Sequence, residues 1–145
     1  MQAQQAGEHA RWRRQGQRET YAAFLTAVEH VRDRSYQTGA ESSHISVEQA
    51  SRQIDQLGER VDAVIRSLSM VIVEGPEEVA SAAEQLRDTS CEVANMLSRV
   101  LDARRNNADV SELSRGLTEE QNWLDELITA YAKAVRLVLD QDPSA

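Results

Sequence analysis

An unbroken heptad of apolar residues runs through the second quarter of the chain. Its members alternate spacings of three and four residues, which places them along one stripe of a single helix. They are small or branched side chains: Val47, Ala50, Ile54, Leu57, Val61, Val64, Leu68 and Val71. The pattern predicts a helix over residues 46–74 that buries this stripe against other helices of a bundle.

A second apolar face precedes the heptad and predicts a first helix over residues 8–36. The face consists of Tyr21, Phe24, Leu25, Val28 and Val31. Upstream, the same side of the helix carries Arg14, Gln17 and Arg18, and arginines cannot enter a dry core without charged partners. We therefore expect only the second half of this helix to pack. The first half should project beyond the bundle or lie along an acidic surface of a second copy or another protein.

Polar stretches mark the ends of these two helices. We expect residues 1–7 to be frayed and residues 37–45 to form a linker in which Gly39 closes the first helix. Ser46 then opens the pattern Ser-Val-Glu-Gln, a capping box with Gln49 at its third helical position. This pattern predicts the start of the second helix.

Gly75 and Pro76 separate the second helix from a third one over residues 76–104. Glycine suits the position after a helix end, and proline suits the first turn, because its missing N–H has no helical partner there. The face of the third helix is Val79, Ala83, Leu86, Ser90, Val93, Leu97 and Val100. The sequence thus predicts an antiparallel hairpin with its corner at Gly75 and Pro76.

The last helix has two candidate starts. Residues 106–108 predict a turn, and an apolar stripe comes after it. The stripe is Val110, Leu113, Leu117, Leu124, Leu127, Tyr131, Val135 and Val138. Gly116, however, precedes a second capping-box pattern that begins at Thr118. We favour one helix over residues 109–139, straight or kinked near the glycine, and keep a restart at Thr118 open.

Four helices of similar length with short connections predict the fold class. It is all-α, an antiparallel (up-down) four-helix bundle whose first helix is extended at its N-terminus. The expected organisation is a basic N-terminal helical extension over residues 1–20, the bundle over residues 21–140 and a disordered tail over residues 141–145.

Composition and charge agree with one acidic domain. The 145 residues suit a single core, and a Cys91 without a second cysteine excludes an intramolecular disulfide. The longest apolar run, residues 70–73, is far shorter than a membrane span, so we expect a cytoplasmic protein with no transmembrane segment. Residues 1–36 carry a net charge of +2, whereas residues 37–145 carry −10. Such an acidic bundle should repel nucleic acid and anionic lipid.

Two segments of the chain resemble known sequences. They read Trp12-Arg-Arg followed by Arg18-Glu-Thr-Tyr-Ala-Ala-Phe-Leu25, and Val71-Ile-Val-Glu-Gly-Pro-Glu-Glu-Val79 with Ala82 and Ala83 after it. Both resemble segments of small, uncharacterised all-helical proteins of actinobacteria, some of which carry an adjoining transmembrane helix. The resemblance implies a bacterial source and a helical hairpin, and neither motif is catalytic.

The side chains that could carry chemistry form no catalytic or metal-binding set in the sequence. Glu41 and His44 match the Glu-x-x-His spacing of di-iron bundles, but those sites need two such pairs and two more carboxylates. His30 lacks the sequence pattern of a phosphotransfer histidine. Cys91 has acidic neighbours instead of the cations that produce a reactive thiolate. We therefore predict no enzyme, no metal and no cofactor.

A basic cluster in the first helix has the best claim to a functional role. It comprises Arg11, Trp12, Arg13, Arg14 and Arg18. Arginines around a tryptophan can contact phosphates, an anionic membrane or an acidic protein surface. Nucleic acid calls for a wider basic footprint, and a membrane calls for more apolar residues opposite the arginines, so an acidic protein surface fits best. The arginines could also simply keep an extended helix soluble.

These observations predict a non-enzymatic helical interaction module, an adaptor or regulatory subunit that associates with itself or with another protein. Trp123, one position off the stripe of the last helix, either widens the core face or anchors a partner. Two alternatives stay open. One is a small-molecule sensor or enzyme with a pocket in the bundle core, for which Ser90 is the one inward polar candidate. The other is a nucleic-acid or anionic-membrane surface binder that uses the N-terminal arginines.

Overall fold

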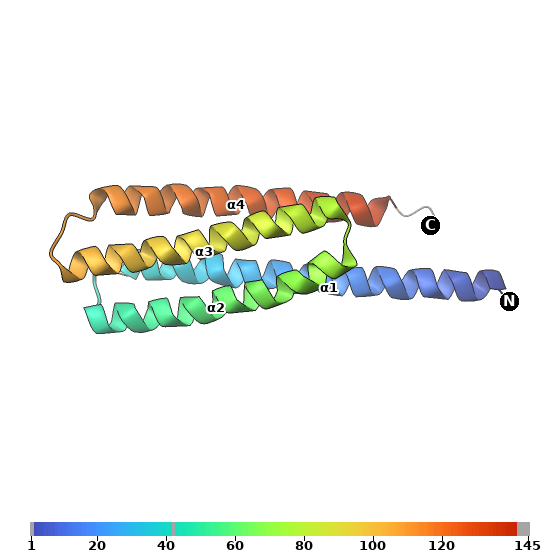
Figure 1. Ribbon diagram of the computed structural model, residues 1–145, viewed down its shortest axis with the longest axis horizontal. Helices are drawn as coiled ribbons and strands as arrows, with labels where there is room; N and C mark the ends of the chain where they lie inside the picture. The colour runs from blue at the N-terminus through green and yellow to red at the C-terminus, as the bar shows by residue number, and fades with distance from the viewer. Residues whose placement is uncertain (1, 42, 142–145) are drawn as a thin grey trace.

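The computed structural model describes residues 2–41 and 43–141, and four long helices account for most of them (Figure 1). Their bounds are α1 (Gln2–Glu41), α2 (Val47–Glu74), α3 (Glu77–Arg105) and α4 (Ser111–Asp140). Consecutive helices run antiparallel, and the described residues contain no strand. The predicted antiparallel four-helix bundle is therefore confirmed. Gln141 caps α4, and residues 142–145 of the predicted tail lie outside the described residues.

The apolar stripes meet in one core. Within the described residues, α1 contacts each of the other helices, whereas α2 and α4 do not contact each other. The predicted face of α3 is buried throughout, and six of the eight heptad positions of α2 are buried, with Val47 and Ile54 half-buried. Phe24 and Tyr131 pack their rings together with centroids 5.3 Å apart. The rest of the core is mainly aliphatic.

The bundle has a closed end, where short connections join α1 to α2 and α3 to α4, and an open end at the α2–α3 corner. At the closed end, the Gln49 N–H donates to the Ser46 hydroxyl at 3.1 Å, and the Ser46 N–H donates to the Gln49 side chain at 3.2 Å. This completes the predicted capping box. At the corner, Gly75 has a φ of 61°, which favours glycine, and Pro76 precedes the first turn of α3.

α1 is longer at both ends than the sequence indicated. It includes residues 2–7, which we expected to be frayed, and residues 37–41, which we expected to belong to a linker. The second difference has a packing cause, because Ser35 and Thr38 continue the buried stripe of α1. Gly39 does not end the helix and lies where an added Cβ would make ordinary contact with α4.

α4 is one continuous helix and does not restart at Thr118. Gly116 lies where α4 approaches α3, since a Cβ added there would stand 2.8 Å from the end of the Met96 side chain. A side chain at this position would displace the end of the flexible Met96 side chain, and the glycine does not break the helix. At the helix start, the hydroxyl and the N–H of Ser111 donate to the Asp109 carboxylate at 2.7 and 2.9 Å, which holds the pKa of that carboxyl below its usual range.

Candidate functional site

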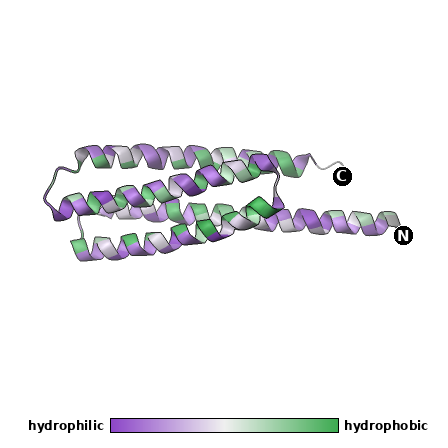
Figure 2. Ribbon diagram, viewed as in Figure 1, coloured by the Kyte–Doolittle hydropathy of each residue, from purple (hydrophilic) through white to green (hydrophobic). Residues whose placement is uncertain are grey.

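The basic cluster lies on a part of α1 that stands outside the core. We call residues 2–20 the N-terminal arm. None of its described side chains is buried, and the first buried residue of α1 is Tyr21. Figure 1 shows the arm projecting past the α2–α3 corner, and Figure 2 shows that most of it is hydrophilic. The described part of the arm thus contributes no buried side chain to the core, although Arg14, Gln17 and Thr20 are half-buried.

Two tyrosine hydroxyls make hydrogen bonds at the point where the arm leaves the bundle. The Tyr21 hydroxyl donates a hydrogen bond to the Gly75 carbonyl at the corner, and the Tyr131 hydroxyl donates to the Tyr21 carbonyl at 3.2 Å. Burial, with a contribution from the Glu74 carboxylate, raises the pKa of Tyr21, and burial also raises the pKa of Tyr131. Both groups therefore remain protonated donors at neutral pH and tie α1, α4 and the corner together.

The five residues of the predicted basic cluster lie within about two turns of the arm helix. The Trp12 side chain is 77% exposed. Arg11, Arg13 and Arg18 are also exposed and form no salt bridge with another described residue, while Arg14 is half-buried. The arm therefore presents cationic groups and an indole ring to the surroundings.

Trp123, the sixth residue predicted to bind a partner, lies apart from the basic cluster. It is 48% exposed on α4, two positions before Asp125, whose carboxylate accepts a hydrogen bond from the Tyr36 hydroxyl at 2.6 Å. That bond, together with burial, raises the pKa of Tyr36 to about 12. Since Tyr36 belongs to the bundle part of α1, Trp123 stands beside the bundle and not beside the arm.

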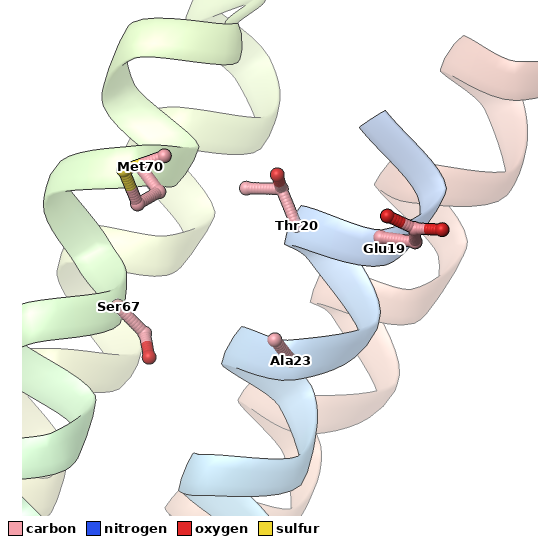
Figure 3. Close-up of a pocket in the computed structure, with 5 residues that line it drawn as sticks. All are labelled: Glu19, Thr20, Ala23, Ser67 and Met70. Carbon is pink, nitrogen blue, oxygen red and sulfur yellow. The ribbon is translucent and has the colours of Figure 1, made fainter. Parts of the chain in front are cut away.

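A groove between α1 and α2 opens where the arm leaves the bundle (Figure 3). Its volume is about 230 Å³. In Figure 3, Thr20 and Ala23 of α1 face Ser67 and Met70 of α2 across this groove, and Glu19 completes its lining. We call it the α1–α2 groove.

The end of α2 beside this groove exposes apolar and acidic side chains together. Met70, Ile72 and Val73 are large apolar residues with exposed side chains, and Val73 is 80% exposed. Three glutamates follow at the corner, and we call them the acidic rim: Glu74, Glu77 and Glu78. Sequence reasoning missed this surface, although an apolar run followed by glutamates was its visible signal.

Polar side chains also enter the core, where sequence analysis named only Ser90. Ser35, Thr38 and Gln121 are buried as well, and the Gln121 side-chain amide donates to the Ser35 hydroxyl at 3.4 Å. Among the described residues, the hydroxyl oxygens of Thr38 and Ser90 have no hydrogen-bond partner. The space beside Thr38 is about 10 Å³, room for one water, whereas a hollow beside Gln121 between α1, α3 and α4 measures about 330 Å³.

Glu41 and His44, the candidate metal ligands, and Cys91, the candidate reactive thiol, have the following surroundings. The Glu41 carboxylate accepts from the Gln53 side chain at 3.0 Å, and the His44 N–H donates to the Glu41 carbonyl at 2.9 Å. Within residues 2–41 and 43–141, no three His, Cys, Asp or Glu residues gather as metal ligands would. Burial raises the pKa of the Cys91 thiol, which keeps it protonated at neutral pH.

Comparison with known proteins adds no relative. No protein-family model, no curated protein and no solved structure matches this chain. Among the described helices, none has both the length and the apolar character needed to cross a membrane.

Proposed function

We propose that this chain is a non-enzymatic helical interaction module whose N-terminal arm binds an acidic protein surface, including that of a second copy. The observation that carries the proposal is the arm itself. It is helical, it exposes Trp12, and it holds Arg11, Arg13 and Arg18 without salt bridges to described residues, although the chain as a whole carries a net charge of −8. Cations beside an exposed aromatic ring suit a protein interface.

The weak support for the arm helix favours a partner. The arm extends from the packed part of α1 and needs no new helix nucleus, but Gly7 and Gly16 lower its helical propensity and none of its described side chains is buried. Binding would supply the packing that the bundle does not provide. An adaptor or regulatory subunit is the class of protein that uses such an element.

The test compares three full-length proteins. The wild type is set beside an arm-swap variant, with Arg11, Arg13, Arg14 and Arg18 changed to Glu. A closed-end control makes the same change at four exposed arginines far from the arm: Arg52, Arg99, Arg105 and Arg115. Each protein is immobilised, and the proteins that it captures from an extract of the source organism are compared at low and at raised salt.

We expect the wild type and the closed-end control to capture the same proteins. The arm-swap variant should lose them, and raised salt should weaken capture by the wild type, because salt screens exposed charges over about 10 Å at 0.1 M. Identical capture by all three proteins would refute the proposal. Arm-dependent binding of duplex DNA or anionic vesicles, without protein capture, would replace it with the surface-binding alternative.

One observation favours a second candidate function, a small-molecule sensor. The hollow of about 330 Å³ reaches the buried Gln121, which offers an amide to a ligand. A compound that raises the melting temperature of the wild type but not of a Gln121→Met variant would support this function. The cytoplasmic location and the actinobacterial source remain predictions from the sequence.

A further inference from the structure

The open end of the bundle has fewer helices than its middle. α2 ends at Glu74 and α3 begins at Glu77, whereas α1 and α4 continue past this corner (Figure 1). Several apolar side chains near this corner are exposed. Those with large exposed side chains are Met70, Ile72 and Val73 of α2 and Leu137 of α4.

The α1–α2 groove (Figure 3) lies near the end of α2, and the acidic rim follows along the chain at the corner. Ala23 and Met70 line the groove, and Val73, three residues after Met70 on α2, is an exposed apolar side chain. The three glutamates of the acidic rim form no salt bridge with another described residue. A helix that carries an aromatic anchor and several cations would complement this surface.

The arm of the same chain has these groups, but it cannot bring Arg11 and Trp12 to the groove. Arg11 precedes Tyr21 by ten residues, so it lies about 15 Å beyond the level of the corner in a continuous helix. That distance exceeds the reach of an arginine side chain, and Trp12 is almost as far away. Arg11 and Trp12 can therefore meet an acidic rim only on another molecule, whereas Arg18, one turn before Tyr21, lies near the corner of its own chain.

We propose that a second copy of this chain docks at the open end, and that each copy lays its arm along the α1–α2 groove of the other. Trp12 covers Met70 and Val73 of the second copy, and the arginines of the arm face its acidic rim. This arrangement rests on the proposed function of the arm and identifies the surface that the arm recognises.

Symmetry and charge both suit this arrangement. A two-fold axis makes the contact twice, because each copy gives one arm and receives one. The arm carries four arginines and two glutamates, a net charge of +2, and the acidic rim carries three negative charges. Both contacts are therefore complementary in charge at the same time.

A reciprocal charge exchange tests the proposal on the full-length chain. The arm-swap variant is paired with a rim-swap variant, in which Glu74, Glu77 and Glu78 are changed to Arg. Each variant alone brings like charges together in both contacts, so self-association should weaken roughly tenfold or more. An equal mixture restores opposite charges in both contacts. Sedimentation velocity at low salt should therefore show dimers of the wild type, monomers of each variant, and dimers again in the mixture.

The tryptophan supplies an independent signal. In a Trp123→Phe background, Trp12 is the one remaining indole, and its emission should shift to shorter wavelength when the arm is covered. We expect this shift when the wild-type arm dimerises and when the two swapped variants are mixed. A Val73→Asp variant, changed at a residue too exposed to affect folding, should lose both the dimer and the shift.

Three results would overturn the arrangement: a monomeric wild type at all soluble concentrations, variants that still dimerise alone, or a mixture that stays monomeric. A monomeric wild type that still captures proteins through its arm would refute the second copy as partner and leave the proposed function standing. A monomeric wild type without arm-dependent capture would refute both.

Discussion

The two parts of α1 form one continuous helix with one stripe of side chains, yet they have opposite surroundings. Tyr21, Phe24 and Val28 occupy the stripe in the bundle and are buried. The same spacing of three and four residues, continued toward the N-terminus, passes through Gln17 and Arg14, which are half-buried. The comparison teaches that the identity of the stripe residues, and not the end of the helix, decides where the core ends.

The largest expected difference in stability is between substitutions at two aromatic residues of α1, Phe24 and Trp12. Phe24→Ala should lower the free energy of unfolding by about 3–5 kcal/mol, because it empties a fully buried site beside Tyr131. Trp12→Ala should change it by no more than about 0.5 kcal/mol, because its side chain is exposed. Urea denaturation, followed by circular dichroism in dilute protein, measures both. Similar losses would mean that the arm folds as part of the core.

The boundary between the two parts should depend on the tyrosine hydroxyls. Tyr131→Phe removes the buried hydrogen bond to the Tyr21 carbonyl and should lower the free energy of unfolding by about 1 kcal/mol. Tyr36→Phe is the matched control, because it removes an exposed hydrogen bond to Asp125 and should have a smaller effect. If both substitutions lowered the free energy of unfolding equally in urea denaturation, the Tyr131 hydroxyl would have no special role at this boundary.

Substitutions at two glycines test the same comparison with smaller expected changes in the free energy of unfolding. Gly58 in α2 has nothing within contact distance of an added Cβ, so Gly58→Ala should raise the free energy of unfolding by about 0.5–1 kcal/mol. Gly16 in the arm is equally open, but Gly16→Ala should raise only the helical content of the arm and leave bundle unfolding unchanged. An equal gain at both sites in urea denaturation would show that arm and bundle unfold together.

The smallest expected effect concerns the thiol. Burial raises the pKa of Cys91, so the reactive thiolate is scarce at neutral pH in the folded chain and more abundant in the unfolded one. Alkylation by iodoacetamide should therefore be slower in buffer than in urea, and the folded rate should rise with pH into the alkaline range. Rapid alkylation of the native protein at neutral pH would assign Cys91 a reactive role.

The sequence was sufficient for the fold because local signals and apolar spacing agreed. The heptad of α2, its capping box at Ser46 and the corner at Gly75 each predicted the observed element. One error arose where packing outweighs local preference, because Gly39 resembles a helix end but lies inside α1. At Gly116 the favoured prediction of one continuous last helix is confirmed, and the alternative restart at Thr118 does not occur.

The candidate site was only half visible in the sequence. The basic cluster, and the absence of an apolar face on that part of the helix, could be predicted, since both follow from residue types at helical spacing. The groove beside them depends on where each helix ends along the bundle axis. Hydrogen bonds of Tyr21 and Tyr131 hold α1, α4 and the corner together at that point. Residues far apart in the sequence, such as Thr20 and Met70, meet there only in three dimensions.

Hydrogen exchange followed by mass spectrometry tests the central claim, that α1 divides at Tyr21 into a core element and an association element. Amides of residues 24–38 should be strongly protected at every protein concentration, because they belong to the core. Amides of residues 8–18 should exchange quickly in dilute protein, become protected as concentration rises, and lose that protection in raised salt. Arm amides that exchange at one rate at all concentrations, or that are as protected as the core in dilute protein, would contradict the account.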